Sequence, residues 1–157
     1  MGRLHALIVQ AAADQDGAVL TASLARRQVE ASVVTNFHDA RRRLTADPPD
    51  LLITDLKLQE YNGLHLVLVA RGWSPRTITV VLADSSDEML RAEAESLGAL
   101  FVIKPLAPEQ LESLSKEMLS RCWARRLSGR QRMGAREVSR GSDDERAVHQ
   151  PRTGHRR

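Results

Sequence analysis

The sequence predicts an α/β fold in which a doubly wound, five-stranded parallel sheet lies between two layers of helices. Three observations predict it. Five short apolar runs, of the kind found in strands buried on both faces of a sheet, recur along the first 103 residues. A segment with helical spacing of apolar residues follows each run. The third observation is that strands and helices alternate at short intervals. Strands connected in this way must be parallel and joined by right-handed crossovers, which gives a three-layer α/β/α sandwich.

The five predicted strands are short, rich in aliphatic or β-branched residues, and bounded by polar or turn-forming residues. They cover residues 4–9, 32–35, 49–55, 77–82 and 100–103. The predicted helices cover about 16–30, the segment from Asn36 through 44, 63–71, the segment from about Ser85 to Gly98, and the segment from Pro108 to about 126. For such a pattern the flavodoxin-like strand order 2-1-3-4-5 is the expected arrangement.

Several helix ends carry recognisable capping residues. Asn36 with Asp39, and Ser85 with Glu88, have the three-residue spacing of a capping box, which places a helix start at each. Gly98 stands where a helix C′ residue is expected. These signals set the boundaries of the second and fourth helices.

Length and composition indicate one globular domain with a tail. The chain has 157 residues, 42% of them hydrophobic and 27% charged, which is ordinary for a soluble domain. Aromatic residues make up only 3%, so aliphatic side chains must fill the core. No apolar run approaches the length that spans a membrane, and the first apolar run is too short for a secretory signal. The single cysteine, Cys122, fits a reducing compartment, so a cytoplasmic protein is expected, with Cys122 as a small buried group on a helix.

The net charge of +3 conceals two oppositely charged parts. From Arg121 onward there are eleven arginines and four acids, so this segment carries +7. The remaining twelve basic and sixteen acidic residues give residues 1–120 a charge of −4. We therefore predict a folded domain over 1–126 and a basic tail over 127–157, which is too poor in large apolar residues to offset the entropy of ordering and is expected to be disordered.

Polar residues gather at one edge of the predicted sheet. Asp55 ends the central strand and Lys104 follows the fifth, while Gln10 and Ala11 follow the first and Ala83 the fourth. In the predicted strand order these four strand ends meet around Asp55. The carboxyl edge of an open α/β sheet is where ligands bind, so this edge is the candidate site.

Three segments resemble the receiver domain of response regulators, over roughly residues 4–126. They are the strand that ends in Asp55, the pair Asn62-Gly63 that opens the third helix, and the string Phe101-Val102-Ile103-Lys104-Pro105. The resemblance implies that Asp55 accepts a phosphoryl group from a histidine kinase, that Lys104 contacts the phosphate, and that Phe101 turns inward when the site is occupied. Such a pair makes chemical sense because an ammonium group offsets the charge that builds up on a transferring phosphoryl group.

The sequence departs from the receiver pattern at positions that matter for the chemistry. Receivers carry two acids after the first strand, where this chain has Gln10 and Ala11, and a serine or threonine at the end of the fourth strand, where it has Ala83. Mg²⁺ requires hard oxygen ligands, so its binding should be weak or lost, and no other cofactor is expected. We therefore predict a degenerate receiver that is not an enzyme, has no catalytic residues and acts as a protein-interaction module in two-component signalling.

The resemblance also suggests where partners bind. Receivers meet partners or dimerise through the fourth helix, the fifth strand and the fifth helix, here about residues 87–98 and 109–121, so a histidine kinase, a downstream effector or a second copy is expected there. An alternative is a nucleic-acid-binding or scaffold protein that acts through the arginine-rich tail, because arginines neutralise phosphates. A flavodoxin-like enzyme has no support, since no glycine-rich phosphate loop or nucleophile with a paired base is present. No membrane partner is expected.

Overall fold

The computed structural model describes residues 2–12 and 15–143, with side chains as far as residue 132. The chain divides into two compact units, Met1–Trp123 and Ala124–Arg157. The first unit contains a five-stranded parallel sheet in the order β2-β1-β3-β6-β7. Since β6 and β7 are the fourth and fifth strands of this sheet along the chain, the predicted order 2-1-3-4-5 is confirmed. Its strands are β1 (Leu4–Val9), β2 (Val29–Val34), β3 (Leu51–Asp55), β6 (Ile78–Ala83) and β7 (Leu100–Ile103).

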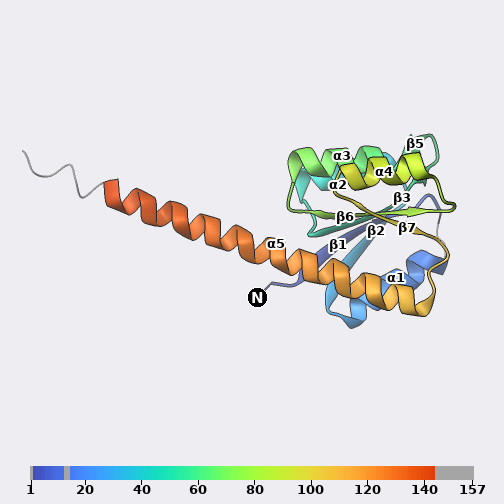
Figure 1. The fold of residues 1–157 in the computed structure, drawn as a ribbon, viewed down its shortest axis with the longest axis horizontal. Helices are drawn as coiled ribbons and strands as arrows, with labels where there is room; N and C mark the ends of the chain where they lie inside the picture. Colours follow the sequence, from blue (N-terminus) through green and yellow to red (C-terminus); the bar gives the residue numbers. More distant parts are fainter. Residues whose placement is uncertain (1, 13–14, 144–157) are drawn as a thin grey trace, which may run out of the picture. The chain divides into compact units, whose positions relative to one another are not determined.

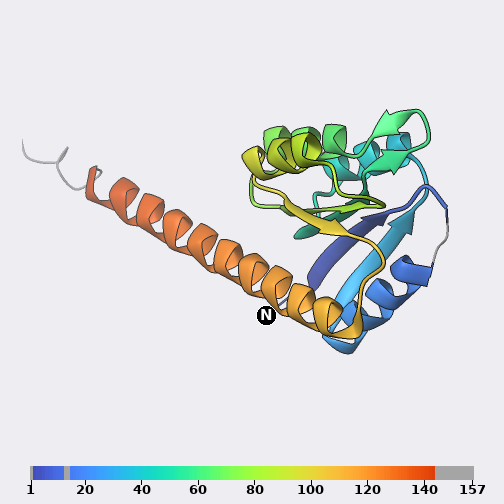
Figure 2. The ribbon, with the colours of Figure 1, turned by 45° about the vertical axis from the view of Figure 1, so that its right-hand side comes forward.

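Helices cover both faces of the sheet, as Figures 1 and 2 show from two directions. The helix α1 and the first part of α5 lie on one face, and α2, α3 and α4 lie on the other. The predicted three-layer sandwich is thus confirmed. The helices are α1 (Gln15–Arg26), α2 (Phe37–Ala46), α3 (Leu64–Trp73), α4 (Glu88–Ser96) and α5 (Pro108–Asp143).

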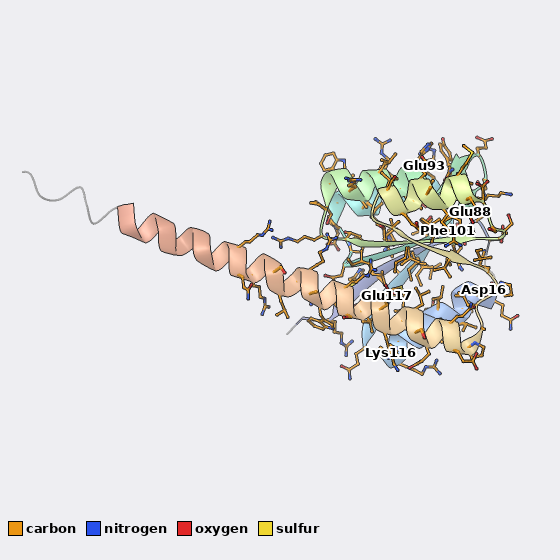
Figure 3. The ribbon with its side chains drawn as sticks, in the orientation of Figure 1. Asp16, Glu88, Glu93, Phe101, Lys116 and Glu117 are labelled. Atoms are coloured by element: carbon orange, nitrogen blue, oxygen red, sulfur yellow. The ribbon has the colours of Figure 1, made fainter. Side chains whose placement is uncertain are left out.

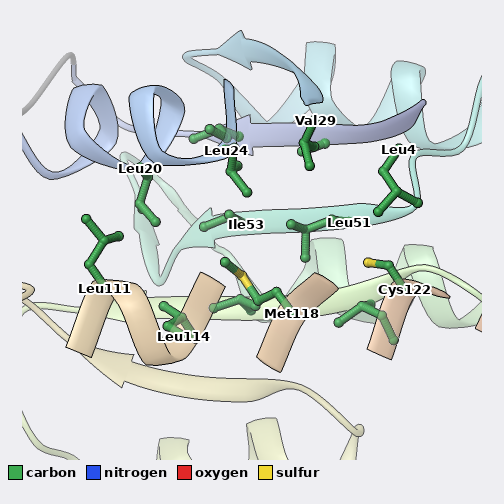
Figure 4. Packing of buried hydrophobic residues seen from close by; sticks show 14 of the residues in the cluster. Leu4, Leu20, Leu24, Val29, Leu51, Ile53, Leu111, Leu114, Met118 and Cys122 are labelled. Atoms are coloured by element: carbon green, nitrogen blue, oxygen red, sulfur yellow. The ribbon is translucent and has the colours of Figure 1, made fainter. Parts of the chain in front are cut away.

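The core on the α1 and α5 face is aliphatic, as the scarcity of aromatic residues predicts. Leu20 and Leu24 of α1 and Met118 of α5 are fully buried against Ile53 of β3 (Figure 4). Burial of each such side chain contributes roughly 1.5–3 kcal/mol. Because helices cover both faces, every residue of β3 and β6 is buried, which explains their unbroken apolar sequences.

Cys122 belongs to this same core and is 3% exposed. Its Sγ lies 3.5 Å from the carbonyl oxygen of Asp50, to which the thiol donates a weak hydrogen bond. The prediction of a small buried group on a helix is therefore confirmed (Figure 4).

Some predicted boundaries are confirmed and others are wrong. The Asn36 side chain accepts a hydrogen bond from the backbone N–H of Asp39 (2.9 Å), and Gly98 has a φ of 81°, as expected for a helix N-cap and a C′ residue. The N-cap of α4 is Asp87 rather than Ser85, because the Asp87 carboxylate accepts hydrogen bonds from the first backbone N–H groups of the helix. The helix α1 ends at Arg26 rather than near residue 30, because residues 29 and 30 pair with β1.

The segment between β3 and α3 contains a small antiparallel hairpin that the sequence pattern does not predict. Its strands are β4 (Lys57–Leu58) and β5 (Tyr61–Asn62), joined through Gln59 in the left-handed region at a φ of 56°. Two-residue strands carry little hydrophobic signal, so the pattern of the sequence does not reveal them.

The last helix is longer than predicted. The sequence pattern places its end near residue 126, with disorder from residue 127, but the backbone is helical as far as Asp143. Arginine, glutamine, alanine and methionine favour helix, and the docked first part supplies the nucleus that a helix otherwise lacks. Disorder is thus the wrong expectation for 127–143, while 144–157 lie outside the described residues, and the division at residue 126 stays a prediction. Among the described residues, no helix is both long and apolar enough to cross a membrane.

Candidate functional site

A cleft of about 360 Å³ opens at the carboxyl edge of the sheet, where the sequence places the site. Segments that follow β1, β3, β6 and β7 all contribute to it. The edge therefore brings together Asp55, Lys104 and Ala11, as the strand order requires. The residues that line the cleft are Ala11, Ala12, Asp55, Lys57, Gln59, Leu82, Asp84 and Lys104.

Asp55 is held from two sides at the end of β3. Its Oδ1 accepts a hydrogen bond from Lys104 Nζ at 3.2 Å, and its Oδ2 accepts one from the backbone N–H of Ala11, also at 3.2 Å. The side chains of Asp55 and Lys104 are only 9% and 13% exposed, so the pair is poorly solvated. A carboxylate in this setting needs both partners, because a buried charge without them is costly.

Lys104 also contacts a second carboxylate, that of Asp84, which the sequence pattern does not mark as a site residue. Its Nζ lies 3.4 Å from Oδ1 of Asp84, a side chain that is 68% exposed. The position directly after β6 could have revealed it, since that strand end borders the cleft in the predicted order. One ammonium group is therefore shared between two carboxylates that approach from β3 and β6.

Gln10 is not among the cleft-lining residues, although it directly follows β1. It is 5% exposed, and its side chain lies against Gly17 of α1, where a Cβ would come within 1.4 Å of Gln10 Nε2. Gly17 thus provides the space that the Gln10 amide occupies. At the position where receivers carry an acid, this chain has a neutral side chain packed on a helix.

Ala83 and Phe101 belong to one apolar cluster between the sheet and α4. Ala83 is 1% exposed and Phe101 is 8% exposed, so the ring is turned into the molecule (Figure 3). The guanidinium carbon of Arg91, on α4, lies 4.9 Å from the centre of the ring, a cation–π arrangement.

The turn before α3 is built on close backbone contacts. The Asn62 side chain accepts a hydrogen bond from the backbone N–H of Leu64 at 2.8 Å. A Cβ on Gly63 would lie 2.1 Å from the carbonyl oxygen of Asp55, so only glycine fits beside the end of β3. The pair Asn62-Gly63 therefore has a structural reason, which is to begin α3 directly against the site.

The cleft is a poor match to Mg²⁺, the ion that the resemblance implies. Its lining side chains carry two aspartates and two lysines, so their formal charges cancel. The other nearby acid that is described, Asp16, contacts the backbone N–H of Leu106 at 3.5 Å, and Asp14 lies outside the described residues (Figure 3). Within residues 2–12 and 15–132, no group of three histidine, cysteine or acidic side chains is placed to hold a metal ion.

Comparison with known proteins shows the family. The family model of the response regulator receiver domain matches residues 11–116, and the chain belongs to this family. No curated protein matches the chain.

Solved structures with the same fold are receiver domains. The signal receiver domain of a protein described as a Luxo repressor from Vibrio parahaemolyticus has a TM-score of 0.72 at 20% identity, over 81% of this chain and 98% of that one. A two-component response regulator from Clostridium difficile has a TM-score of 0.66 at 21% identity, over 76% and 98%. The beryllofluoride-activated NtrC4 receiver domain dimer has a TM-score of 0.68 at 16% identity, over 75% and 98%. At these identities the likeness shows the fold alone.

Proposed function

We propose that this chain is an atypical receiver module that signals by docking on another protein, with weak or absent Mg²⁺-dependent phosphorylation of Asp55. The observation that carries the proposal is the lining of the cleft, in which two aspartates face two lysines and their formal charges cancel. Where receivers carry an acid after the first strand, Gln10 is 5% exposed and packs on α1. The groups that would hold Mg²⁺ and a phosphoryl group are thus replaced, while the docking face of the fold is kept.

The charges in the cleft support the same reading. Phosphoryl transfer depends on cations that neutralise the transferring group, and Mg²⁺ supplies most of that charge in such reactions. Lys104 is present but already shared between Asp55 and Asp84, which would repel an incoming phosphoryl group. Asp55 can still present an oxygen nucleophile, so slow modification is compatible with the geometry whereas rapid transfer is not.

The docking face we propose consists of α4, β7 and the first part of α5. Met89 on α4 is 84% exposed, the most exposed of the large apolar side chains in the described residues. The neighbouring Glu88 and Glu93 of the same helix are exposed as well (Figure 3). An exposed methionine among carboxylates suits a partner with an apolar pocket and basic rim, such as a histidine kinase or an effector protein.

Titration with Mg²⁺ and beryllofluoride, followed by amide NMR, tests the chemical part of the proposal. We expect no saturable shifts near Asp55, Ala83 or Phe101 in the wild-type chain at millimolar Mg²⁺. The matched variant Gln10→Asp/Ala11→Asp restores two acids after β1 and should bind Mg²⁺ measurably more tightly. Saturable shifts in the wild-type chain that vanish in Asp55→Asn would overturn the proposal and indicate a working phosphorylation switch.

A second copy of the chain is another partner for this face, since the NtrC4 receiver domain above is a dimer. Sedimentation equilibrium of the wild-type chain and of Met89→Glu distinguishes the two cases. A monomer in both favours a different protein as the partner. A concentration-dependent dimer that Met89→Glu dissociates would assign the face to self-association.

A further inference from the structure

The helical continuation of α5 through residues 124–143 has an unusual charge pattern. It contains six arginines, no lysine and only two acids, Glu137 and Asp143, which gives it a formal charge of +4. Residues 124–136 contain five of these arginines and no acid at all. The composition of this segment predicts a disordered tail, but its backbone is helical, and a helix places its charges at fixed intervals.

Two arginines of the continuation, Arg130 and Arg132, differ from arginines of the receiver unit in the acids that their helix offers them. In the receiver unit Arg27 pairs with Glu112, Arg91 with Glu95 and Arg121 with Glu117. In the continuation Arg130 and Arg132 are exposed, and the sequence has no carboxylate three or four positions from either one. The i,i+3 and i,i+4 pairing that offsets charge on a helix is therefore not open to them.

We propose that this continuation, residues 124–143, is a binding surface for double-stranded nucleic acid, read through its phosphates rather than its bases. The inference goes beyond the docking function proposed for the receiver unit and does not depend on it. Guanidinium groups form paired, planar hydrogen bonds with phosphate oxygens, which explains a basic segment made of arginine alone. An α-helix about 10–12 Å wide also fits the major groove of a duplex, which is about 12 Å wide.

The length of the helix suits several phosphate contacts. From Arg125 to Arg140 the rise is about 22 Å at 1.5 Å per residue. Four or five arginines over this length can each displace a counterion from the nucleic acid. The proposed contacts are to phosphates, which carry no sequence information, so binding should be insensitive to sequence.

An anionic membrane is a poorer match to the same helix. A helix that lies in a membrane interface needs a continuous apolar face opposite its basic one. In the described side chains of the continuation, residues 124–132, Leu127 is the only large apolar residue, at 53% exposed. With Met133 and Val138, the sequence of residues 124–143 has three large apolar residues in twenty, too few for such a face, so the polyanion that suits this helix is a nucleic acid.

The proposal can be tested on the full chain by fluorescence anisotropy. The probe is a labelled DNA duplex of about 20 base pairs with a random sequence. We expect the wild-type chain to bind at 50 mM salt and to lose roughly a hundredfold to a thousandfold in affinity at 200 mM, a log–log slope of roughly −3 to −5. The variant Arg130→Gln/Arg132→Gln keeps helix propensity, which circular dichroism should confirm. It should bind about tenfold or more weakly at 50 mM salt, with a slope shallower by about 1.8.

The control variant Arg41→Gln/Arg76→Gln removes the same charge from exposed positions of the receiver unit and should change the affinity less than about twofold. An equal loss in both variants would overturn the proposal, because net charge alone would then explain binding. Undetectable duplex binding by the wild-type chain at 50 mM salt would overturn it too. So would tighter binding to phosphatidylglycerol vesicles than to the duplex, which would assign the helix to a membrane surface.

Discussion

The two halves of the cleft differ in how much of the receiver pattern they keep. In the half formed by β3 and β7, Asp55 and Lys104 form a pair at 3.2 Å, and Gly63 packs against the backbone of Asp55. In the half formed by β1 and β6, Gln10 packs on α1 and Ala83 belongs to an apolar cluster. In the first half the receiver-like residues also stabilise the fold. In the second half the residues present contribute to packing, and the groups that would serve only phosphoryl chemistry are replaced.

The largest expected effect comes from the glycine that supports the first half. Gly63→Ala would place a Cβ 2.1 Å from the carbonyl oxygen of Asp55, which the backbone can relieve only by moving. We expect a loss of about 3 kcal/mol or more in the free energy of unfolding, measured by urea denaturation. The matched control is Gly72→Ala near the end of α3, where nothing lies within 4 Å of the new Cβ. Alanine favours helix, so this control should be neutral or stabilising by up to about 1 kcal/mol. Equal effects of the two substitutions would contradict the contact.

A smaller effect is expected when the charge pair is broken. Lys104→Met leaves the Asp55 carboxylate, 9% exposed, without its cation, at a cost of about 1–3 kcal/mol. The double variant Asp55→Asn/Lys104→Met removes the buried charge as well and should recover part of this loss. Chemical denaturation of the wild-type chain, Asp55→Asn, Lys104→Met and the double variant completes a double-mutant cycle. A coupling energy near zero would mean that the pair contributes nothing to the first half of the cleft.

The second half can be tested by adding the missing hydroxyl. Ala83→Thr inserts bulk and a polar group beside Phe101 in a cluster where Ala83 is 1% exposed. We expect a loss of about 1–2 kcal/mol and a displacement of the Phe101 ring, visible in its aromatic NMR shifts. Ala83→Val adds similar volume without a hydroxyl and separates the two causes. An unmoved ring in both variants would show that Ala83 does not control its position.

The smallest effect lies outside the cleft, in a surface ion pair between α1 and α5. The Arg27 guanidinium, by hydrogen bond and charge, lowers the pKa of Glu112 below its ordinary value. Because the folded-state pKa is the lower one, the pair stabilises the protein at neutral pH, and the benefit disappears as the pH falls through the folded-state pKa. Glu112→Gln should therefore lower the melting temperature slightly at pH 7, and the difference should shrink as the pH falls through the folded-state pKa. A larger effect than that of Lys104→Met would reverse the ranking of exposed and buried pairs.

The fold could be predicted because its signals are local and repeated. Unbroken apolar strands such as β3 and β6 and helix ends such as Asn36 and Gly98 each act within a few residues, and together they define one topology. The proximity of Asp55 and Lys104 followed from that topology, because parallel strands bring their carboxyl ends to one edge. Their roles, and the weak Mg²⁺ binding expected from Gln10 and Ala11, stay predictions.

Other features depend on contacts that no local pattern contains. The second carboxylate that contacts Lys104 belongs to Asp84. Asp84 follows β6 and Lys104 follows β7, so the two side chains meet only because these strands are adjacent in the sheet. The packing of Gln10 on Gly17 depends on the angle at which α1 leaves β1. The continuation of α5 was missed because a sequence without apolar periodicity gives no packing signal, although helix propensity and a docked first part are enough to extend it.

The buried position of Cys122 has a practical consequence for all of these variants. Cys122 is 3% exposed and packs against the sheet from α5, so an alkylating reagent can reach its sulfur only when that helix separates from the sheet. As the chain has one cysteine, the rate of alkylation reports a single opening event. The rate at which this thiol is alkylated therefore measures how often the receiver unit opens, without an attached label.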